Sequence, residues 1–142
     1  MGEPTSGPGQ VLTAWIGLWN DHALQRFSEL ASTRYVHHAM TGRDLQLDGF
    51  RDGFRAIVEA FPDVTYRIGH LVAGGDLAAA YLTATGTHAG PYVGIPASGQ
   101  TVTFRGMYHC RVLQDRIVED WDVFDLLNPI LQLGGSIRPP QL

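Results

Sequence analysis

The spacing of apolar residues changes once along this chain, and that change limits the class of fold that the sequence can adopt. Before Pro62 the apolar residues recur every three or four positions, as Val11, Trp15 and Trp19 do, which is the period of an amphipathic helix. From Val64 onward they recur on alternate or near-alternate positions, as in a strand with one buried face. Helices followed by an antiparallel meander predict an α+β domain rather than a parallel α/β sheet.

Turn and cap residues divide this pattern into elements. In the helical half, Asn20 and Asp21 end a first helix and cap a second that carries Leu24, Phe27 and Leu30. Asp48 caps a third helix, which ends at Pro62. In the second half, Gly74-Gly75-Asp76 and Gln114-Asp115 are hairpin turns. We expect strands at 64–72, 77–88, 101–113 and 117–125, a loop at 89–99 and a closing helix at 126–133.

Composition and charge exclude several classes of function. The chain has 142 residues, of which 44% are hydrophobic and 17% charged, so it can form one compact core. Its formal charge is −4 and it contains no basic run, which argues against nucleic acid and anionic membranes as partners. No stretch is long enough for a membrane span. The single Cys110 excludes an intramolecular disulfide and suits a reducing cytoplasm. We expect a flexible leader at 1–10, one domain at 11–135 and a tail at 136–142.

Five segments, taken in order, carry a resemblance to a known family. They are Ala60-Phe61-Pro62-Asp63, Gly86-Thr87-His88-Ala89-Gly90, Gly94-Ile95-Pro96-Ala97-Ser98-Gly99, the run from Arg116 to Asp125 and Leu131-Gln132-Leu133-Gly134. From about Leu12 to Gly134 the chain resembles the SnoaL-like polyketide cyclases of the nuclear transport factor two superfamily. This resemblance implies a curved antiparallel sheet wrapped around the N-terminal helices, which forms a cone with an apolar cavity. It also implies a homodimer that pairs through the convex face of the sheet.

The strand at 117–125 contains the main candidate for catalysis. By periodicity alone, Trp121 and Val123 would face the core and Asp122 would be a solvated surface carboxylate. The resemblance reverses this choice, because SnoaL-like cyclases have an inward-facing aspartate that acts as general acid/base five residues after the isoleucine of this strand. Counting from Ile117 leads to Asp122. Burial in an apolar cavity raises the pKa of a carboxyl group, so that it can take and return a proton near neutral pH.

The strand at 101–113 offers the second catalytic candidate. Its more apolar face includes Tyr108 and Cys110, and the opposite face includes His109. The family has a histidine on this strand, and alignment on Arg111 places Tyr108 at that position. Either a one-residue bulge turns His109 inward, or Tyr108 replaces the histidine as a donor to a developing oxyanion. We favour Tyr108, although a core tyrosine with a satisfied hydroxyl is the commoner case.

Other residues are candidates for substrate binding at the cavity. His37 follows the second expected helix and corresponds to a polar position at the cavity mouth of family members. His88 either shapes the end of a strand or binds substrate, and Asp125 either binds substrate or caps the closing helix. Aromatic side chains would line the cavity, although each one alone is more often a core residue. The full set is His37, Trp15, Trp19, Phe61, Tyr81, His88, His109 and Asp125.

Three functions from different classes are compatible with this sequence. The first is a cofactor-free cyclase that closes a ring in an apolar polyketide-like substrate by an aldol-type reaction. The second is a related enzyme, because Trp121-Asp122-Val123-Phe124 is similar to family members that assist hydroxylation, and other relatives isomerise or template a cycloaddition. The third is a non-catalytic binding domain, for which Asp122 would not be buried. No ligand spacing predicts a metal site.

Overall fold

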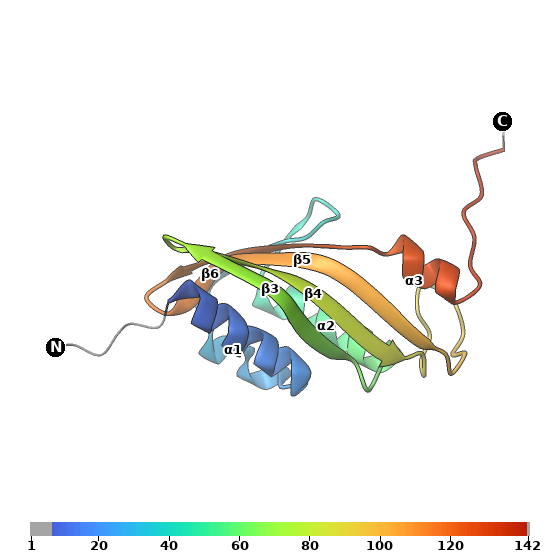
Figure 1. Cartoon of the computed structure of the whole chain (residues 1–142), viewed down its shortest axis with the longest axis horizontal. Helices are drawn as coiled ribbons and strands as arrows, with labels where there is room; N and C mark the ends of the chain where they lie inside the picture. The colour runs from blue at the N-terminus through green and yellow to red at the C-terminus, as the bar shows by residue number, and fades with distance from the viewer. Residues whose placement is uncertain (1–6, 142) are drawn as a thin grey trace.

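The computed structural model of this protein describes residues 7–141 and shows a long, curved sheet with two helices packed against one face (Figure 1). Its class is α+β, as expected. The helical elements are α1 (Pro8–Asn20), a short 3-10 helix (Leu24–Glu29), α2 (Leu47–Ala60) and α3 (Leu127–Gln132). The strands are β1 (Ala31–His38), β2 (Asp44–Leu45), β3 (Thr65–Gly74), β4 (Leu77–Thr87), β5 (Thr101–Leu113) and β6 (Arg116–Phe124).

The strands form one six-stranded sheet in the order β2-β1-β6-β5-β4-β3. Four consecutive strands, β3 to β6, make the antiparallel meander that the period-two pattern predicts. The sheet is mixed rather than wholly antiparallel, because β1 runs parallel to β6. This pairing brings the chain segment around residue 37 beside the segment around residue 120.

The first half of the chain is less helical than expected. The second expected helix is only the 3-10 helix Leu24–Glu29, and residues 31–38 after it form strand β1. Burial alternates at the end of β1, where Tyr35 and His37 are buried and Val36 is only partly buried. A buried histidine and tyrosine do not produce a hydrophobic period, so the sequence pattern did not reveal the strand.

The start of the domain differs from the expected boundary at the N-terminal end of the chain. Helix α1 begins at Pro8, within the expected leader at 1–10, and the leader residues 1–6 lie outside the described residues. Residues 136–141 contain no helix or strand, and the final tail residue also lies outside the described range.

Irregularities in strand pairing bend the sheet around its helices. The register shifts at Gly69 between β3 and β4, and at Val118 between β6 and β5. Such bulges increase the local twist and curvature of a sheet. At Gly106 of β5 the ring of Phe124 and the carbonyl of Val123 lie where a Cβ would otherwise be. Glycine is therefore needed where β5 and β6 curve across the cavity.

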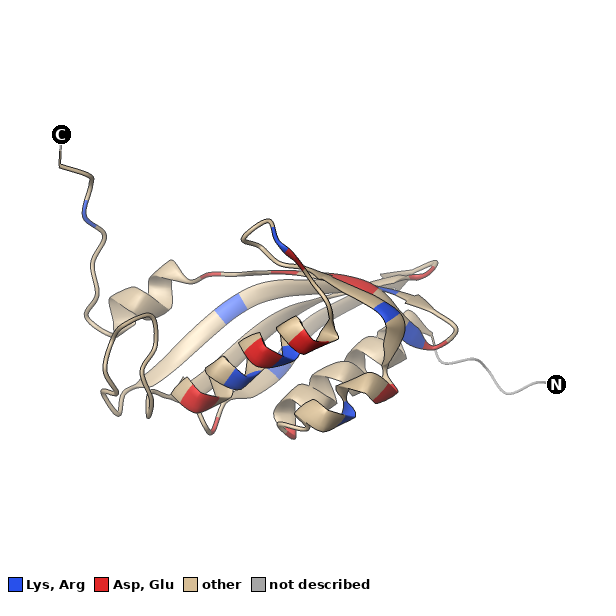
Figure 2. Ribbon diagram, turned by 180° about the vertical axis from the view of Figure 1, so that it is seen from behind, with Lys and Arg blue, Asp and Glu red and all other residues tan. Residues whose placement is uncertain are grey.

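The concave face of the sheet packs against α1 and α2, and this contact forms the core. Helix α2 turns its acidic and basic residues away from the sheet (Figure 2). Trp15 and Trp19 of α1 pack against Phe50 of α2, with ring centroids 5.7 and 5.9 Å from that of Phe50. A second cluster around Phe61 and Phe104 fills the end of the molecule near α3. The cavity described below lies between these two clusters.

Candidate active site

A bulge in β6 turns two carboxylates toward the concave side of the sheet. Val112 of β5 pairs with Ile117, and Arg111 pairs with Glu119, so that Val118 is the extra residue. Ile117 and Asp120 are both fully buried although they are three positions apart. In a regular strand, residues three apart point to opposite faces. The bulge resolves the ambiguity in the sequence pattern and places Asp120 and Asp122 on the inner face.

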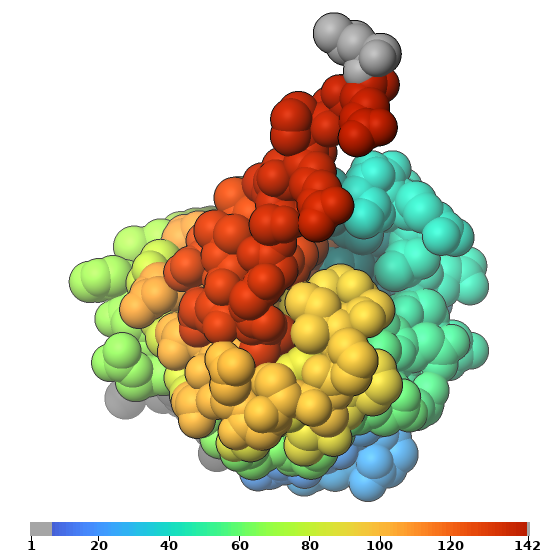
Figure 3. All heavy atoms as spheres, turned by 90° about the vertical axis from the view of Figure 1, so that its right-hand side faces the viewer, coloured from blue at the N-terminus to red at the C-terminus, as the bar shows by residue number. Residues whose placement is uncertain are grey.

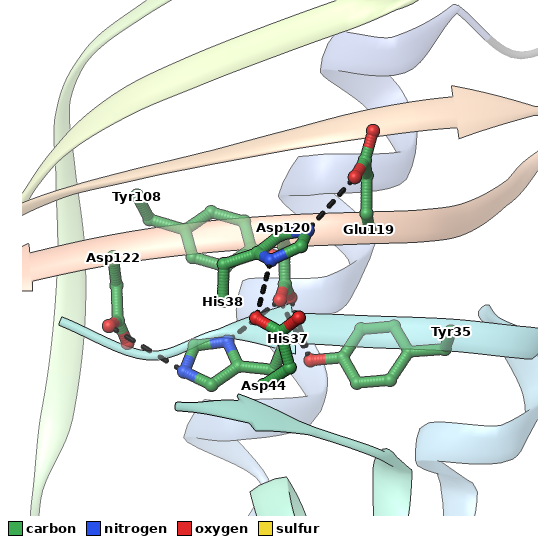
Figure 4. A network of polar contacts seen from close by, with 8 residues as sticks. All are labelled: Tyr35, His37, His38, Asp44, Tyr108, Glu119, Asp120 and Asp122. Carbon is green, nitrogen blue, oxygen red and sulfur yellow. Dashed lines mark hydrogen bonds and ion pairs between the residues drawn. The ribbon is translucent and has the colours of Figure 1, made fainter. Parts of the chain in front are cut away.

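Asp120 is the centre of a buried network of hydrogen bonds (Figure 4). Its carboxylate accepts hydrogen bonds from the hydroxyl of Tyr35 at 2.8 Å and from the hydroxyl of Tyr108 at 2.6 Å. His37 Nδ1 lies 2.8 Å from Oδ1 of the same carboxylate. These donors come from β1 and β5, the two strands that flank β6. A fully buried carboxylate needs such donors, because a charge without partners is costly in a protein interior.

His37 connects the buried carboxylate to the second one. Its Nε2 lies 3.7 Å from Oδ1 of Asp122, on the side of the ring opposite Asp120 (Figure 4). Burial lowers the pKa of His37, but the hydrogen bond to Asp120 and the charges of both carboxylates outweigh burial and raise it. Burial raises the pKa of Asp122, which the charge of His37 opposes. Both pKa values are therefore raised, so each group binds its proton more firmly than it does in water.

Asp122 and His37 lie in the wall of a cavity of about 260 Å³. Met40 and Leu126 also line this cavity and are each 42% exposed, so it reaches the surface near the β1–β2 turn and the start of α3. Figure 3 views the end of the molecule where α3 lies across from α2 and this turn. Most of the wall is apolar or aromatic, from Trp19, Phe50, Phe54, Ile57, Val64, Tyr66, Tyr92, Phe104 and Phe124.

Tyr108 faces the inner side of the sheet, and no bulge turns His109 inward. Tyr108 is fully buried, its hydroxyl donates to Asp120, and it does not line the cavity. The expectation of a hydroxyl free to meet substrate is therefore wrong, because Asp120 already engages it. His109 lies on the outer face, where its ring stacks on Trp121 with centroids 4.3 Å apart. This position also corrects the expectation that His109 binds substrate.

The structure brings only part of the expected substrate-binding set to the cavity. Trp19 and His37 line it, as expected. Trp15 and Phe61 do not, because each is completely enclosed in one of the two core clusters. Tyr81 lies on the outer face of the sheet, since it pairs with Met107 and alternates with the inward-facing Leu82. The sequence period indicated that these aromatic residues are at least partly buried. It did not show whether each one faces the cavity, the core clusters or the outer face of the sheet.

His88 and Asp125 have structural contacts instead of cavity contacts. His88 is completely buried, and its Nδ1 accepts a hydrogen bond from the backbone N–H of Ser98 at 3.2 Å. Asp125 Oδ1 accepts backbone N–H groups of Leu127 and Asn128, both at 3.0 Å, at the start of α3. Asp125 therefore caps the closing helix, which was the alternative to a role in substrate binding. Neither side chain lines the cavity.

Sequence reasoning missed Asp120 as a functional residue. Asp120 and Asp122 are two positions apart on β6, so they lie on the same face of the strand. This spacing could have indicated that Asp120 faces inward together with Asp122. Tyr92 also lines the cavity and was not expected there, whereas Tyr66 lines it as expected for a cavity aromatic. Burial raises the pKa of both tyrosines, so their hydroxyls stay protonated and can donate.

Within residues 7–141, two kinds of feature are absent. In this range no three or more His, Cys, Asp and Glu side chains are grouped so that they could hold a metal ion. No helix in the same range combines the length and apolar character that crossing a membrane requires.

Comparison with known proteins agrees with this fold. The sequence profile of the SnoaL-like polyketide cyclases matches residues 9–133, and the chain belongs to this family. IdmH of Streptomyces antibioticus, named as a candidate polyketide cyclase, is similar in structure with a TM-score of 0.84 and 27% identity, over 91% of this chain and 99% of IdmH. No match was found among curated proteins.

Two other solved structures share the fold at lower identity. AclR of Streptomyces galilaeus, named as a candidate hydroxylase, has a TM-score of 0.84 and 23% identity, over 94% of this chain and 85% of AclR. A SnoaL-like polyketide cyclase of Agrobacterium tumefaciens has a TM-score of 0.76 and 23% identity, over 91% of this chain and 99% of that one. At this level of identity the likeness establishes the fold alone, since one fold hosts many reactions.

Proposed function

We propose that this protein is a cofactor-independent cyclase that closes a ring in a polyketide-like substrate of secondary metabolism by forming a carbon–carbon bond. The observation that carries the proposal is a carboxylate of raised pKa, Asp122, in the wall of an apolar cavity. Family membership and the likeness to IdmH support it. The proposed location is the cytoplasm, whose reducing conditions suit a protein with a single cysteine. Burial raises the pKa of the Cys110 thiol to about 12, so the thiol stays protonated.

The proposed reaction begins with the removal of a proton from carbon. Asp122 takes a proton from the carbon next to a carbonyl group, and the electron pair of the C–H bond forms an enolate. The enolate carbon attacks a second carbonyl of the same molecule, so that a carbon–carbon bond forms and the carbonyl π pair moves to oxygen. The new alkoxide receives one proton, and a β-hydroxy ketone results. The cavity contributes by holding both reacting ends of the substrate in contact.

His37 replaces Tyr108 as the proposed partner of the developing oxygen charge. Tyr108 directs its hydroxyl to Asp120, whereas His37 lines the cavity beside Asp122. A donor fixed at the place where negative charge develops stabilises the transition state more than water does. We assign the base to Asp122 and the oxyanion donor to His37.

The test uses two neutral aromatic probes that need no cofactor. In 5-nitrobenzisoxazole, loss of the ring C–H proton breaks the N–O bond and releases a coloured phenolate, so the probe reports the base. In 1-phenylhexane-1,5-dione, an intramolecular aldol condensation gives 3-phenylcyclohex-2-enone, so the probe reports ring closure. Asp122→Asn should slow both reactions by about 10²–10⁴-fold, because the amide cannot accept the proton.

The matched control is Asp52→Asn, the same chemical change at an exposed carboxylate of α2. It should leave both rates unchanged. Equal rates in the wild-type and Asp122→Asn proteins would overturn the assignment of the base. Base activity on the first probe without ring closure in the second would contradict the cyclase and favour an isomerase on the same cavity.

A further inference from the structure

The Asp120 network connects the buried side of the sheet to the cavity. Asp120 does not line the cavity, yet three side chains from β1 and β5 direct a donor at it. Two of them, Tyr35 and Tyr108, also lie outside the cavity wall. The third, His37, is in contact with both the network and the cavity. The network therefore ends at one ring that substrate can reach.

The hydrogen bonds of Asp120 determine where the proton of His37 lies. An ionised carboxylate only accepts hydrogen bonds, so the Nδ1 atom at 2.8 Å must carry a hydrogen. In the neutral ring, Nε2 then has a free lone pair, and this atom faces Asp122. The ring is further held by the edge of Phe50 of α2, with centroids 4.9 Å apart. His37 thus has one nitrogen that is fixed as a donor and one that is free to take or give a proton.

We propose that Asp120 is a positioning residue that holds His37 as the proton carrier between Asp122 and the substrate oxygen. This inference rests on the proposed function of Asp122. Asp122 receives the proton from substrate carbon and passes it to Nε2 of His37. The resulting imidazolium keeps its Nδ1–H on Asp120 and donates the Nε2 proton to the new alkoxide. The proton moves from carbon to oxygen, and all three side chains return to their initial states.

The separation of 3.7 Å between His37 Nε2 and Asp122 Oδ1 is compatible with this relay. Hydrogen bonds of catalytic groups are often long before substrate binds, and they shorten in the complex. The charged and titratable groups that face His37 are Asp120 and Asp122 of β6 and the neighbouring His38. Burial and His38 oppose the imidazolium and the two carboxylates favour it, and the net effect raises the pKa of His37.

The first measurement is ¹⁵N NMR of the wild-type protein with labelled histidine rings, because the two nitrogen shifts report the tautomer directly. The His37 signals are assigned by their absence in His37→Gln. We expect the neutral ring to carry its proton on Nδ1. A neutral ring with the proton on Nε2 would overturn the proposal, whatever any other variant does.

The second measurement compares Asp120→Asn with Glu119→Gln, which makes the same chemical change one residue away on the outer face. Glu119 contacts His38 and Arg111 and has no contact with His37. Asp120→Asn should lower the pKa of His37 and move its proton toward Nε2, while Glu119→Gln should shift only His38. An unchanged His37 in folded Asp120→Asn would overturn the positioning role.

The turnover rates of Asp120→Asn and Asp122→Asn distinguish the proton relay from the proposed cyclase function. With the diketone probe, Asp120→Asn should lower kcat roughly tenfold to a hundredfold and leave KM nearly unchanged, because positioning is lost and the cavity wall is not. Its pH profile should shift with the pKa of His37. Full activity of Asp120→Asn beside an inactive Asp122→Asn would overturn the relay and leave the cyclase in place. An active Asp122→Asn would overturn the assignment of Asp122 as the base, and the NMR measurement would still decide the state of His37.

Discussion

Asp120 and Asp122, both on the inner face of β6, differ in burial and in hydrogen-bond partners, and this difference suits them to different roles. Asp120 has no exposed surface and accepts hydrogen bonds from three side chains, so its oxygens are fully occupied. The side chain of Asp122 is 15% exposed and has a single close ionic neighbour in His37. A carboxylate with few partners in an apolar wall favours its protonated form. Asp120 is therefore suited to hold a neighbour and Asp122 to exchange a proton.

This difference predicts how stability depends on pH. Burial raises the pKa of Asp122 above its ordinary value of 3.8. Below pH 3.8 the group is protonated in both the folded and the unfolded chain, so it adds no pH dependence. Between that value and the folded pKa the unfolded chain loses its proton first, and stability falls as pH rises. Relative to Asp122→Asn, the wild-type protein should become progressively less stable through this window.

Urea unfolding of both proteins at a series of pH values checks this prediction. Rates with the benzisoxazole probe should rise through the same pH window, because only the ionised form of Asp122 accepts a proton. A stability difference that shrinks as pH rises would show instead that the charge of His37 dominates and lowers the pKa of Asp122.

At the scale of elements, the family-like segments at 60–63 and 86–90 attach the end of α2 to the sheet. The carboxylate of Asp63 accepts the backbone N–H and the hydroxyl of Thr87, at 2.6 and 2.7 Å. The backbone N–H groups of Ala89 and Gly90 both donate to the carbonyl of Ala60. Ser98 and the buried His88 then hold the following loop. These segments resemble the family because they build its fold, and none of these contacts lies in the cavity wall.

The close contact at Gly90 gives a prediction about this attachment. A Cβ at Gly90 would clash with the carbonyl oxygen of Glu59, so the end of α2 would have to move. Gly90→Ala should therefore destabilise the protein by roughly 1–3 kcal/mol. The matched control is Gly53→Ala within α2, where a Cβ meets nothing within 4 Å. That change should stabilise the helix by about 0.5–1 kcal/mol. Thermal unfolding of both variants measures the difference, and equal melting temperatures would contradict the attachment.

At the scale of the whole molecule, the outer face of the sheet carries exposed apolar side chains that have no assigned role. Tyr81, Met107 and Val123 lie in register across β4, β5 and β6, and Val123 is 65% exposed. Val72 adds an apolar side chain on β3 that is 67% exposed. Apolar residues gathered on one face of a protein often mark an interface. We propose that two copies of the chain pair through this face as a homodimer.

The dimer can be tested with a charge at the middle of this row. Met107→Lys would place a charge in the interface and should weaken association about tenfold or more. Ile137→Lys is the control, because Ile137 is 69% exposed and lies in the segment after α3 rather than on the sheet. Sedimentation at micromolar concentration should give twice the 15.5 kDa chain mass for the wild type and the control. A wild-type protein that sediments only as a monomer would contradict the dimer.

Much of the fold could be predicted from local patterns in the sequence. The four strands of the meander and α2 were expected close to their observed positions, because alternation at period two and the cap and turn residues act over short distances. The buried face of β5, which includes Tyr108 and Cys110, followed from the same alternation. Asp122 itself was found through family resemblance, since periodicity alone placed it on the surface.

The composition of the site depended on contacts that no local pattern contains. His37 meets Asp120 only because β1 lies parallel to β6, and these residues are 83 positions apart in the chain. The bulge at Val118 decides which side chains of β6 face inward. The sequence by itself determined the α+β class, the meander and the alternation of its faces, because these follow from short-range sterics and burial. Only the tertiary structure decided that Asp120, His37 and Asp122 form one site, because strand register and packing between distant segments set that geometry.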